Sequence, residues 1–480
     1  MEFRLESVAL AAEEPAFEGR RILSLQKDAH RFNMTPTYEV RIDRLNRFIS
    51  MMDRHADAIL QAASEDFGHR APQETQLFDV VIVTMAAKRA RRELKQWMKP
   101  RRVPTSIANR PGYNRMLRQP LGTVGIIGAW NYPLYTVLGP AVDALAAGNR
   151  ILMKPSELTP RSSALLASMV RECFAEDEMA VVTGGLDVAR GFSELPFDHL
   201  IFTGSGAVGR QVAQAAARNL TPVTLELGGK SPVIFDASCN LAMATERVMR
   251  AKLLNSGQTC VAPDYLLVPR ARLTECVQRL SAAVEKLYPN WAASPDYTSI
   301  VNERHVARLQ GLLDDARSKG AQVVSIGETS GQAGRKMAPT LVLNVSDDMR
   351  IMQEEIFGPL LPILPYDDPD DALQYVNHHD KPLALYWFGE SRAARDAVLS
   401  RTLSGGVTVN DCIWHAAQEG QPFGGVGPSG SGAYHGEHGF RTFSKEKPVY
   451  FQSRFTGGTL LYPPYGKTFD RMLKILKRIT

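Results

Sequence analysis

Short apolar segments alternate with longer amphipathic stretches along most of the chain. Between Tyr38 and Lys99, apolar residues such as Leu45, Phe48 and Met52 recur three or four positions apart, which predicts an α-helical lead-in. Beyond Pro100, short apolar runs predict strands with amphipathic helices between them. The predicted strands are Thr123–Ile127, Arg150–Met153, Ala180–Val182 and His199–Phe202, and the predicted helices are Arg161–Phe174 and Gly206–Asn219.

A second region of the same kind begins near Pro232. Its predicted strands are Val233–Phe235, Tyr265–Val268, Gln322–Ser325 and Thr340–Asn344, and its predicted helices are Leu241–Leu254, Arg272–Leu287 and Glu303–Lys319. Strand, helix and strand at this spacing are typical of a parallel sheet covered by helices, so the fold class is α/β.

The stretch from Leu121 to Val142 carries no charge and is long enough to resemble a membrane span. Pro133, Pro140 and several glycines would leave backbone groups without partners in lipid, and Asn131 lies in the middle. We therefore expect a buried strand, a tight loop and the start of a helix.

Composition narrows the function classes. The chain has 480 residues, 44% hydrophobic and 22% charged, and a net charge of +5 spread among both signs, which gives no basis for nucleic-acid binding. Five cysteines without a Cys-x-x-Cys pair fit reduced thiols in the cytoplasm, and the charged N-terminus lacks the apolar core of a signal peptide. His435 and His438 match no metal-binding pattern, so we expect no metal site.

The most informative polar residues are Glu226 and Cys260. Glu226 precedes Leu-Gly-Gly-Lys-Ser-Pro and Cys260 ends Gly-Gln-Thr-Cys, so small residues let a ligand approach both side chains. A thiolate that adds to a carbonyl and a base that activates water are the parts of covalent acyl chemistry. A lone cysteine is more commonly a small buried hydrophobe, and the residues before Cys260 are what favour a nucleophile.

Asn131 follows Trp130 in a glycine-rich loop after a predicted strand. Its amide N–H could stabilise a developing oxyanion. Taken alone, an asparagine before an aromatic residue and a proline is more often part of a turn, and both interpretations stay open.

The run Gly204–Gly209 matches Gly-x-Gly-x-x-Gly after an apolar strand, which favours dinucleotide binding, although a plain strand-to-helix turn has the same pattern. Glu226 could be the downstream ribose partner, but the residues after it indicate a loop feeding a cleft rather than a strand end. Lys154 and Glu157 are better ribose candidates, with a solvated ion pair at a helix start as the alternative. Thr224 stands where a P-loop requires glycine, which excludes that motif.

Together these segments resemble the aldehyde dehydrogenase superfamily over nearly the whole chain. The matching motifs, in the family's order, are Pro120–Pro133, Lys154–Glu157, Phe202–Gly209, Glu226–Pro232, Gly257–Cys260, Glu354–Pro359 and Pro422–Gly425. The Val-Ala-Pro-Asp-Tyr run after Cys260 looks like the class 3 branch. The ending Leu461–Lys467 is similar to that of bacterial coniferyl aldehyde dehydrogenases.

The resemblance implies the fold and its division. We expect an aldehyde dehydrogenase-like fold with a Rossmann-type NAD-binding domain (residues 1–99 and 118–229) and a second α/β catalytic domain (230–412). A small β bridging and oligomerisation element (100–117 and 433–450) and a C-terminal tail (451–480) would complete it.

The family's roles carry over to the matching residues. Cys260 would be the nucleophile that forms a thiohemiacetal, Asn131 and the Cys260 N–H would hold the oxyanion, and Glu226 would activate the water that hydrolyses the thioester. The implied cofactor residues are Trp130, Lys154, Glu157, Gly204, Ser205, Val208, Gly209, Leu227, Glu355 and Phe357.

The implied reaction is NAD(P)-dependent oxidation of an aldehyde to its acid. The Glu157 carboxylate would repel a 2′-phosphate, which favours NAD and leaves NADP as the alternative. A coniferyl-type aromatic aldehyde is the expected substrate, and a long-chain aliphatic aldehyde is the alternative. From other classes, a non-redox cysteine acyl-transfer enzyme and a non-catalytic structural protein are the competing hypotheses.

The chain ends in a predicted basic amphipathic helix. Its apolar positions are Phe469, Met472, Leu473, Leu476 and Ile479, with Arg471, Lys474, Lys477 and Arg478 between them. We favour packing against its own subunit or against a partner in a homodimer over contact with an anionic membrane.

Overall fold

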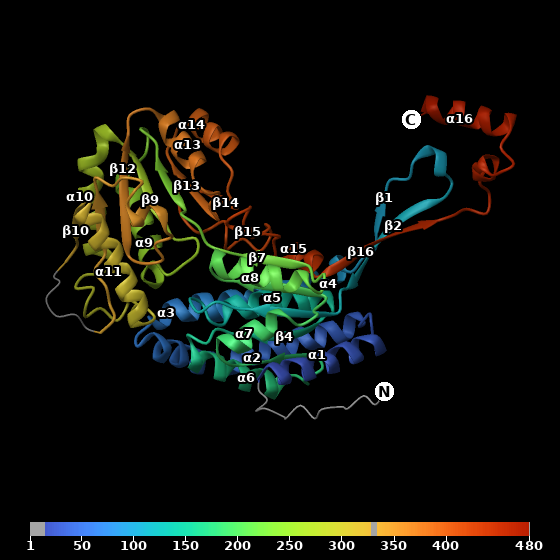
Figure 1. The fold of residues 1–480 in the computed structure, drawn as a ribbon, viewed down its shortest axis with the longest axis horizontal. Helices are drawn as coiled ribbons and strands as arrows, with labels where there is room; N and C mark the ends of the chain where they lie inside the picture. Colours follow the sequence, from blue (N-terminus) through green and yellow to red (C-terminus); the bar gives the residue numbers. More distant parts are fainter. Residues whose placement is uncertain (1–14, 328–333, 480) are drawn as a thin grey trace, which may run out of the picture.

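The computed structural model describes residues 15–327 and 334–479, which contain three separate β-sheets; helices cover the two larger ones (Figure 1). The first part of the chain is helical. It contains α1 (Pro15–Phe32), α2 (Tyr38–Phe67), α3 (Pro72–Thr75), the π-helical η1 (Gln76–Val81) and α4 (Ile82–Trp97). The helical lead-in predicted from Tyr38 to Lys99 is therefore confirmed.

A six-stranded sheet follows, with strand order β15-β7-β6-β3-β4-β5. Its strands are β3 (Thr123–Ile127), β4 (Arg150–Lys154), β5 (Met179–Val181), β6 (His199–Thr203), β7 (Val223–Glu226) and β15 (Gly430–Ser431). Its helices are α5 (Tyr135–Ala147), α6 (Pro160–Cys173), α7 (Leu186–Ser193) and α8 (Gly206–Ala217). All the strands except β15 run parallel, as predicted.

The expectation that Glu226 lies in a loop is wrong, because Glu226 is the last residue of β7. The hydrogen-bonded register with β6 and β15 extends the strand through it, pairing it with Thr203 on one side and Gly430 on the other. The carboxylate therefore projects from the end of a sheet rather than from a flexible segment.

Successive side chains of a strand point to opposite faces, so the six-stranded sheet has a hydrophobic core on each face. Ile151 and Met153 pack in one cluster with residues of α2 and α5, whereas Leu152 packs in the other with Ile22 and Phe192 of α1 and α7. A strand that is apolar on both faces must be covered on both faces, which is why its residues read as one continuous apolar run.

The second α/β region forms a seven-stranded sheet with strand order β10-β11-β12-β9-β8-β13-β14. Its strands are β8 (Pro232–Phe235), β9 (Tyr265–Pro269), β10 (Gln322–Ser325), β11 (Thr340–Leu343), β12 (Leu360–Tyr366), β13 (Ala384–Phe388) and β14 (Gly406–Val409). Its helical elements are α9 (Leu241–Leu253), η3 (Leu254–Gly257), η4 (Arg270–Arg272), α10 (Leu273–Leu287), α11 (Glu303–Ser318), α12 (Arg350–Gln353), α13 (Pro369–His378) and α14 (Arg392–Arg401). The elements predicted up to residue 344 are confirmed; β12, β13 and β14 were not predicted.

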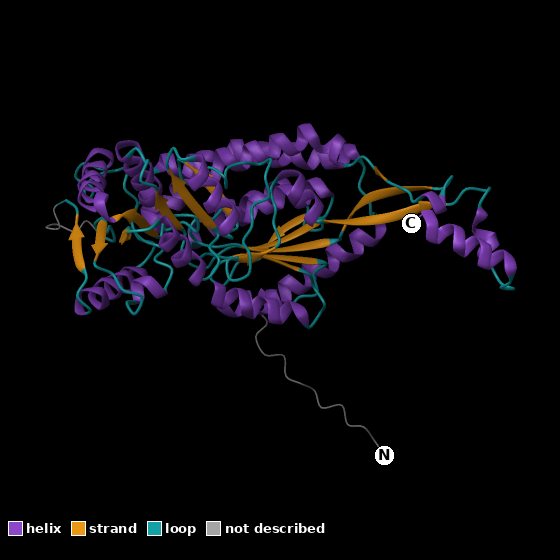
Figure 2. Ribbon diagram, turned by 90° about the horizontal axis from the view of Figure 1, so that it is seen from above, coloured by secondary structure: helices purple, strands orange, loops and turns teal. Residues whose placement is uncertain are grey.

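A three-stranded antiparallel sheet projects from the body as an arm (Figures 1 and 2). It consists of β1 (Arg101–Val103), β2 (Tyr113–Pro120) and β16 (Ser444–Phe451), with η2 (Ile107–Asn109) in the β1–β2 connection and α15 (Gly436–Thr442) before β16. These strands fall close to the ranges predicted for a small β element. The division of the chain into domains stays a prediction.

Beyond the arm, η5 (Gly457–Leu461) leads into the terminal helix α16 (Lys467–Ile479). Figure 1 shows α16 well away from both large sheets, so packing against the body of its own subunit is not observed in the described residues. Leu473 and Ile475 are exposed. Among the helices of residues 15–327 and 334–479, none is long and apolar enough to cross a bilayer.

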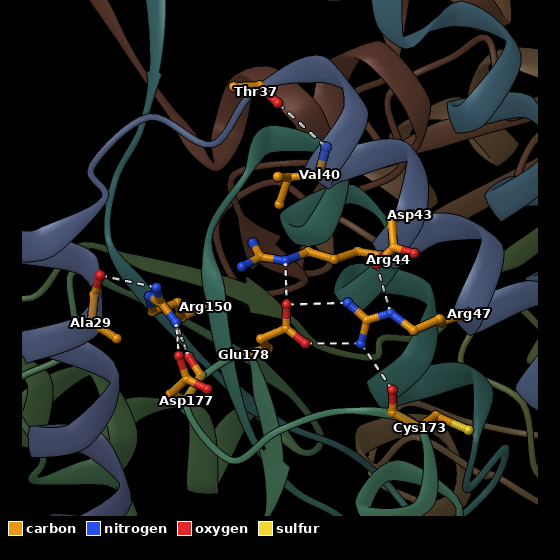
Figure 3. A network of polar contacts seen from close by, with 10 residues as sticks. All are labelled: Ala29, Thr37, Val40, Asp43, Arg44, Arg47, Arg150, Cys173, Asp177 and Glu178. Atoms are coloured by element: carbon orange, nitrogen blue, oxygen red, sulfur yellow. Dashed lines mark hydrogen bonds and ion pairs between the residues drawn. The ribbon is translucent and has the colours of Figure 1, made fainter.

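A buried ionic network fixes the helical lead-in to the six-stranded sheet (Figure 3). The Glu178 carboxylate, just before β5, accepts hydrogen bonds from Arg44 Nε at 3.0 Å and from Arg47 at 2.8 and 3.1 Å, both on α2. In parallel, Arg150 of β4 donates to the Ala29 carbonyl of α1 at 2.9 Å. Two helices are thus attached to the sheet by charge-assisted hydrogen bonds, which are stronger than neutral ones.

We predict that Glu178→Gln will destabilise the protein by about 3 kcal/mol, because it leaves the buried Arg44 guanidinium without a carboxylate. The control Glu176→Gln removes an exposed pair with Arg21 and should cost less than about 1 kcal/mol. Urea denaturation followed by circular dichroism compares the two. Equal losses of stability in the two variants would contradict the role given to the buried Glu178 pair.

The difference in stability between the wild type and Glu178→Gln should depend on pH. Burial acts to raise the pKa of Glu178, but the hydrogen bonds and charges of Arg47 and Arg44 outweigh it and hold the pKa below its ordinary value. A depressed carboxyl pKa stabilises the fold above the unfolded pKa and stops doing so as pH falls through the folded pKa. The difference between wild type and Glu178→Gln should therefore shrink below about pH 4.

Candidate active site

One cavity of about 550 Å³ lies where the parallel strands of the six-stranded sheet end and the second α/β region meets them. Its lining comes from the segments after β3 and β4, the ends of β6 and β7, the start of α8, and the loops around Cys260 and Glu355. Ligands of open α/β sheets bind at this carboxyl edge of the strands.

The cavity brings together all but one of the residues singled out from the sequence. Those that line it are Asn131, Glu226, Cys260, Trp130, Lys154, Glu157, Gly204, Ser205, Val208, Leu227, Glu355 and Phe357. Gly209 does not line it; a Cβ at this position would lie 2.7 Å from the Leu227 side chain, so its closest contact is internal packing.

The loop that carries Cys260 is held in an unusual backbone conformation. After α9 ends, Asn255, Ser256 and Gly257 have φ values of 50°, 53° and 77°, all in the left-handed region. For the first two this costs free energy, which surrounding contacts must offset. The Glu74 carboxylate does so by accepting the Asn255 N–H at 3.1 Å and the Thr298 hydroxyl at 2.9 Å.

Asn255 also fixes Asn131 beside this loop. Its side-chain amide donates to the Asn131 carbonyl at 3.0 Å and to the Gln258 carbonyl at 3.1 Å, and the Asn131 amide donates to that same Gln258 carbonyl at 3.1 Å. The Asn131 amide therefore contacts the backbone two positions before Cys260. An amide nitrogen carries two hydrogens, and the Gln258 contact uses one of them.

Asp79 of η1 holds the end of the loop that contains Asn131. Asp79 accepts the backbone N–H groups of Leu134 and Tyr135 at 3.1 and 3.0 Å, where α5 begins. Asp79 is itself paired at 3.2 Å with Arg70, and both side chains are fully buried. A carboxylate at a helix N-terminus satisfies orphan donors and interacts favourably with the helix dipole.

Burial controls the electrostatics of the two reactive side chains. Burial, together with the nearby carboxylates of Glu355 and Glu226, raises the pKa of the Cys260 thiol to about 12. Burial also raises the pKa of Glu226 well above its ordinary value, and neither of its carboxyl oxygens has a hydrogen-bond partner among the described residues. A buried carboxyl without protein partners is free to bind water or a ligand and to act as a base of unusually high strength.

The backbone on both sides of Glu355 is tied to residues that come just before β8 and β9. Lys230 Nζ pairs with Asp264 and donates to the Ile351 and Glu354 carbonyls at 2.8 and 3.0 Å, and Asp264 accepts the Ile356 N–H at 2.9 Å. Lys230 thus anchors the backbone and does not act as the lysine of a P-loop, consistent with the exclusion of that motif from the sequence. Burial raises the pKa of Glu355 to about 7.

The other end of the cavity offers groups suited to a nucleotide. Lys154 ends β4 and pairs with Glu157 at 3.0 Å in a turn that precedes α6, so the pair does not lie at a helix start. Ser205 caps α8 by accepting the Val208 N–H. Between the two ends Trp130 packs edge-on against Phe357, with ring centroids 5.3 Å apart.

Sequence reasoning missed a further set of lining aromatic residues. They are Phe78, Tyr132, Tyr135, Phe423 and Tyr434. Tyr132 hydrogen-bonds Thr259 at 2.8 Å, and Tyr135 hydrogen-bonds His435 at 2.9 Å. Residues 300 positions apart meet only in the folded chain, so no local pattern could indicate the second pair.

His435 and His438 belong to no group of metal-ligating side chains in the part of the chain that the structure describes. Within residues 15–327 and 334–479, no group of three or more His, Cys, Asp or Glu side chains could hold a metal ion. The five cysteines are all unpaired by disulfides.

Comparison with known proteins agrees with this geometry. The Aldehyde dehydrogenase family model matches residues 21–449. The coniferyl aldehyde dehydrogenase of a Pseudomonas species is 46% identical over 460 residues, covering 95% of both chains. Aldehyde dehydrogenase family 3 member H1 of Arabidopsis thaliana is 38% identical over 445 residues, covering 92% of this chain and 91% of that protein.

Among solved structures, the substrate-bound state of Staphylococcus aureus AldH superposes with a TM-score of 0.90 at 39% identity, covering 95% of this chain and 99% of that one. The resemblance inferred from the motifs is confirmed. The chain belongs to the aldehyde dehydrogenase family and oxidises aldehydes.

Proposed function

We propose that this protein oxidises an aromatic, coniferyl-type aldehyde to its carboxylic acid, with NAD as the preferred acceptor. The observation that carries the proposal is the convergence of Cys260, Glu226 and Asn131 in one largely apolar cavity. The alternative substrate, a long-chain aliphatic aldehyde, would need an apolar channel without a preference for flat rings. Support for the aromatic class comes from the lining aromatic residues and from the coniferyl aldehyde dehydrogenase relative.

The proposed chemistry begins at Cys260. Its thiolate attacks the aldehyde carbon, a C–S bond forms, and the former carbonyl oxygen becomes an oxyanion. The second hydrogen of the Asn131 amide and the Cys260 backbone N–H are the donors proposed for that oxyanion. Because burial and two carboxylates oppose the thiolate, Glu226 is the base proposed to take the thiol proton.

The second half of the reaction hydrolyses a thioester on Cys260. After Glu226 has released the thiol proton to solvent, it removes a proton from water, the water oxygen bonds to the acyl carbon, and the C–S bond breaks to return the thiolate. The raised pKa of Glu226 makes it a stronger base than an exposed glutamate. The acid then leaves the cavity.

The residues at the nucleotide end fit a nicotinamide dinucleotide. Lys154 and Glu157 offer a donor and acceptors for ribose hydroxyls, and the Ser205-capped start of α8 offers backbone N–H groups to phosphate. Glu355 and Phe357 would hold the nicotinamide ribose and ring, with Trp130 and Leu227 lining the cleft. When bound, the cofactor supplies the hydride acceptor that turns the thiohemiacetal into the thioester.

We further propose that the protein acts as a cytoplasmic homodimer. Tyr113 and Phe451 on the arm are exposed and stacked on each other at 4.6 Å, and α16 continues beyond them away from the body. An arm that exposes apolar residues is a natural contact for a second subunit. The domain division given above, with residues 100–117 and 433–450 as the oligomerisation element, belongs to the same proposal.

The first prediction concerns a variant that lacks the nucleophile. Cys260→Ala should reduce aldehyde oxidation by at least about 10³-fold while leaving NAD binding within about twofold, because the alanine changes no cofactor contact. Absorbance of reduced nicotinamide and fluorescence titration measure the two quantities. Cys173→Ala, at a cysteine outside the cavity, is the matched control. Retained oxidation in Cys260→Ala would refute the mechanism.

The second prediction separates the two halves of the reaction. Glu226→Gln keeps the side-chain shape but removes the base, so thioester hydrolysis should slow by about 10²-fold or more. A stopped-flow trace should then show a burst of reduced nicotinamide followed by a slow steady state. An unchanged steady-state rate without a burst would count against the role of Glu226.

The third prediction concerns the acceptor and the substrate. With an aldehyde panel from short aliphatic to long aliphatic to cinnamyl-type, kcat/KM should be highest for the cinnamyl type, and NAD should be preferred over NADP. Glu157→Gln removes the like charge near a 2′-phosphate, so it should improve NADP relative to NAD by about tenfold. A preference for NADP in the wild type would contradict the role proposed for Glu157 in repelling a 2′-phosphate.

A further inference from the structure

A buried arginine that contacts the lining of the cavity has no part in the proposed roles. Arg70 lies between α2 and α3, and its side chain is fully buried. Its guanidinium pairs with the Asp79 carboxylate at 3.2 Å. The guanidinium carbon lies 4.9 Å from the ring centroid of Tyr132, which lines the cavity, and 5.1 Å from that of Phe67. Taking a cation out of water costs free energy, so carboxylates must balance it.

Two carboxylates lie within reach of this charge. Asp79 is the ion-pair partner, and Glu74 lies on α3, which begins two residues after Arg70. Burial raises the pKa of both carboxyl groups, and the positive charge of Arg70 is the strongest influence that opposes the rise in each. Only an ionised carboxyl group can accept hydrogen bonds at both oxygens without also being a donor. Arg70 therefore favours the form in which both groups are pure acceptors.

The Glu74 carboxylate holds the loop of the nucleophile. Its two oxygens accept the Asn255 N–H at 3.1 Å each, and one of them also accepts the Thr298 hydroxyl at 2.9 Å. Asn255 is the first residue of the left-handed turn that leads to Cys260. Because that turn is strained, the position of the thiol depends on the contacts that keep the turn in place.

The Asp79 carboxylate holds the loop of the oxyanion donor. One of its oxygens accepts the Leu134 N–H at 3.1 Å and the Tyr135 N–H at 3.0 Å. These two residues end the loop that contains Asn131 and begin α5. The position of the Asn131 amide therefore depends on Asp79 in the way that the thiol depends on Glu74.

Tyr132 joins the two loops directly. It follows Asn131 in the chain, and its ring packs on the Arg70 guanidinium. Its hydroxyl hydrogen-bonds that of Thr259, the residue before Cys260, at 2.8 Å. One cation is thus linked, through two carboxylates and one ring, to the segments that carry the nucleophile and the oxyanion donor.

We propose that Arg70 is a positioning residue for aldehyde oxidation, whose charge keeps Glu74 and Asp79 ionised so that they hold the Cys260 thiol and the Asn131 amide in place for attack on the aldehyde. Arg70 is not among the residues that line the cavity. Its guanidinium nitrogens have no hydrogen-bond acceptor among the described residues, so its contact with Asp79 is an ion pair rather than a bidentate fork. The role therefore requires the charge more than the shape of the group. This inference rests on the proposed function.

Arg70→Met tests the proposal, because it keeps most of the side-chain volume and removes the charge. In stopped-flow with saturating NAD and a cinnamyl-type aldehyde, the first turnover should slow by about 10²-fold, the cost of a reacting group displaced by about 1 Å. The dissociation constant of NAD should stay within about twofold of wild type. Arg70→Lys restores the charge without the fork and should bring the first turnover back to within about fivefold.

Two variants separate the two carboxylates. Glu74→Gln should slow both the first turnover and the alkylation of Cys260 by iodoacetamide by about tenfold, because the thiol loses its position beside Glu226, the proposed base. Asp79→Asn should slow the first turnover but leave alkylation within about twofold, because alkylation forms no oxyanion. Peptide mass spectrometry identifies the alkylated cysteine.

Arg41→Met is the matched control. Arg41 is a second buried guanidinium, 1% exposed, and it donates to the carbonyls of Ala146 and Ala147 at 3.1 and 2.7 Å. It therefore holds the end of α5, whereas Asp79 holds the start of the same helix. Its loss should lower the midpoint of thermal unfolding but leave the first turnover within about twofold of wild type.

The outcomes that would overturn the proposal are distinct from a failure of the proposed function. A wild type that forms no reduced nicotinamide from any aldehyde would refute the function. With an active wild type, a fast first turnover in Arg70→Met, no recovery in Arg70→Lys, or an equal loss in Arg41→Met would refute only the role of Arg70. If Arg70→Met does not fold, the carboxylate variants carry the test, and an unchanged first turnover in both would refute that role.

Discussion

The hydrogen bonds of Asn255 hold the active site together. Through its backbone N–H it binds the carboxylate of Glu74, and through its side chain it binds the carbonyls of Asn131 and Gln258. Three segments distant in the sequence thereby meet at one left-handed turn. The position of Cys260 relative to the Asn131 amide, and hence the geometry of the oxyanion donors, depends on that turn. The cost of the strained backbone is offset by these satisfied polar contacts.

Near this turn, burial changes the protonation of two reactive side chains from what it would be in water. The Cys260 thiol and the Glu226 carboxyl are both buried, and each resists ionisation because of that burial. By contrast, the buried charges that serve the fold, such as Arg70 with Asp79 and Lys230 with Asp264, are paired. An unpaired buried polar group costs folding stability, and the Glu226 carboxyl that lines the cavity is such a group.

Much of this could be predicted from the sequence, for identifiable reasons. Parallel strands buried on both faces, such as β3 and β4, appear as compact apolar runs, and the glycine-rich segments at their ends are local patterns. The glycine-rich residues after Glu226 favour a loop, whereas pairing with β6 and β15 makes Glu226 the end of a strand in the fold. The Tyr135–His435 contact and the anchoring of α5 by Asp79 are tertiary, and no periodicity encodes them.

The central claim is that one cavity performs covalent acyl chemistry on Cys260. The most direct measurement is rapid acid quenching of wild-type protein mixed with NAD and a cinnamyl-type aldehyde, followed by peptide mass spectrometry. The account predicts an acyl group, the aldehyde less one hydride and bound as a thioester, on the peptide that contains Cys260 and on no other cysteine. Oxidation of the aldehyde without any acyl group on that peptide would contradict it.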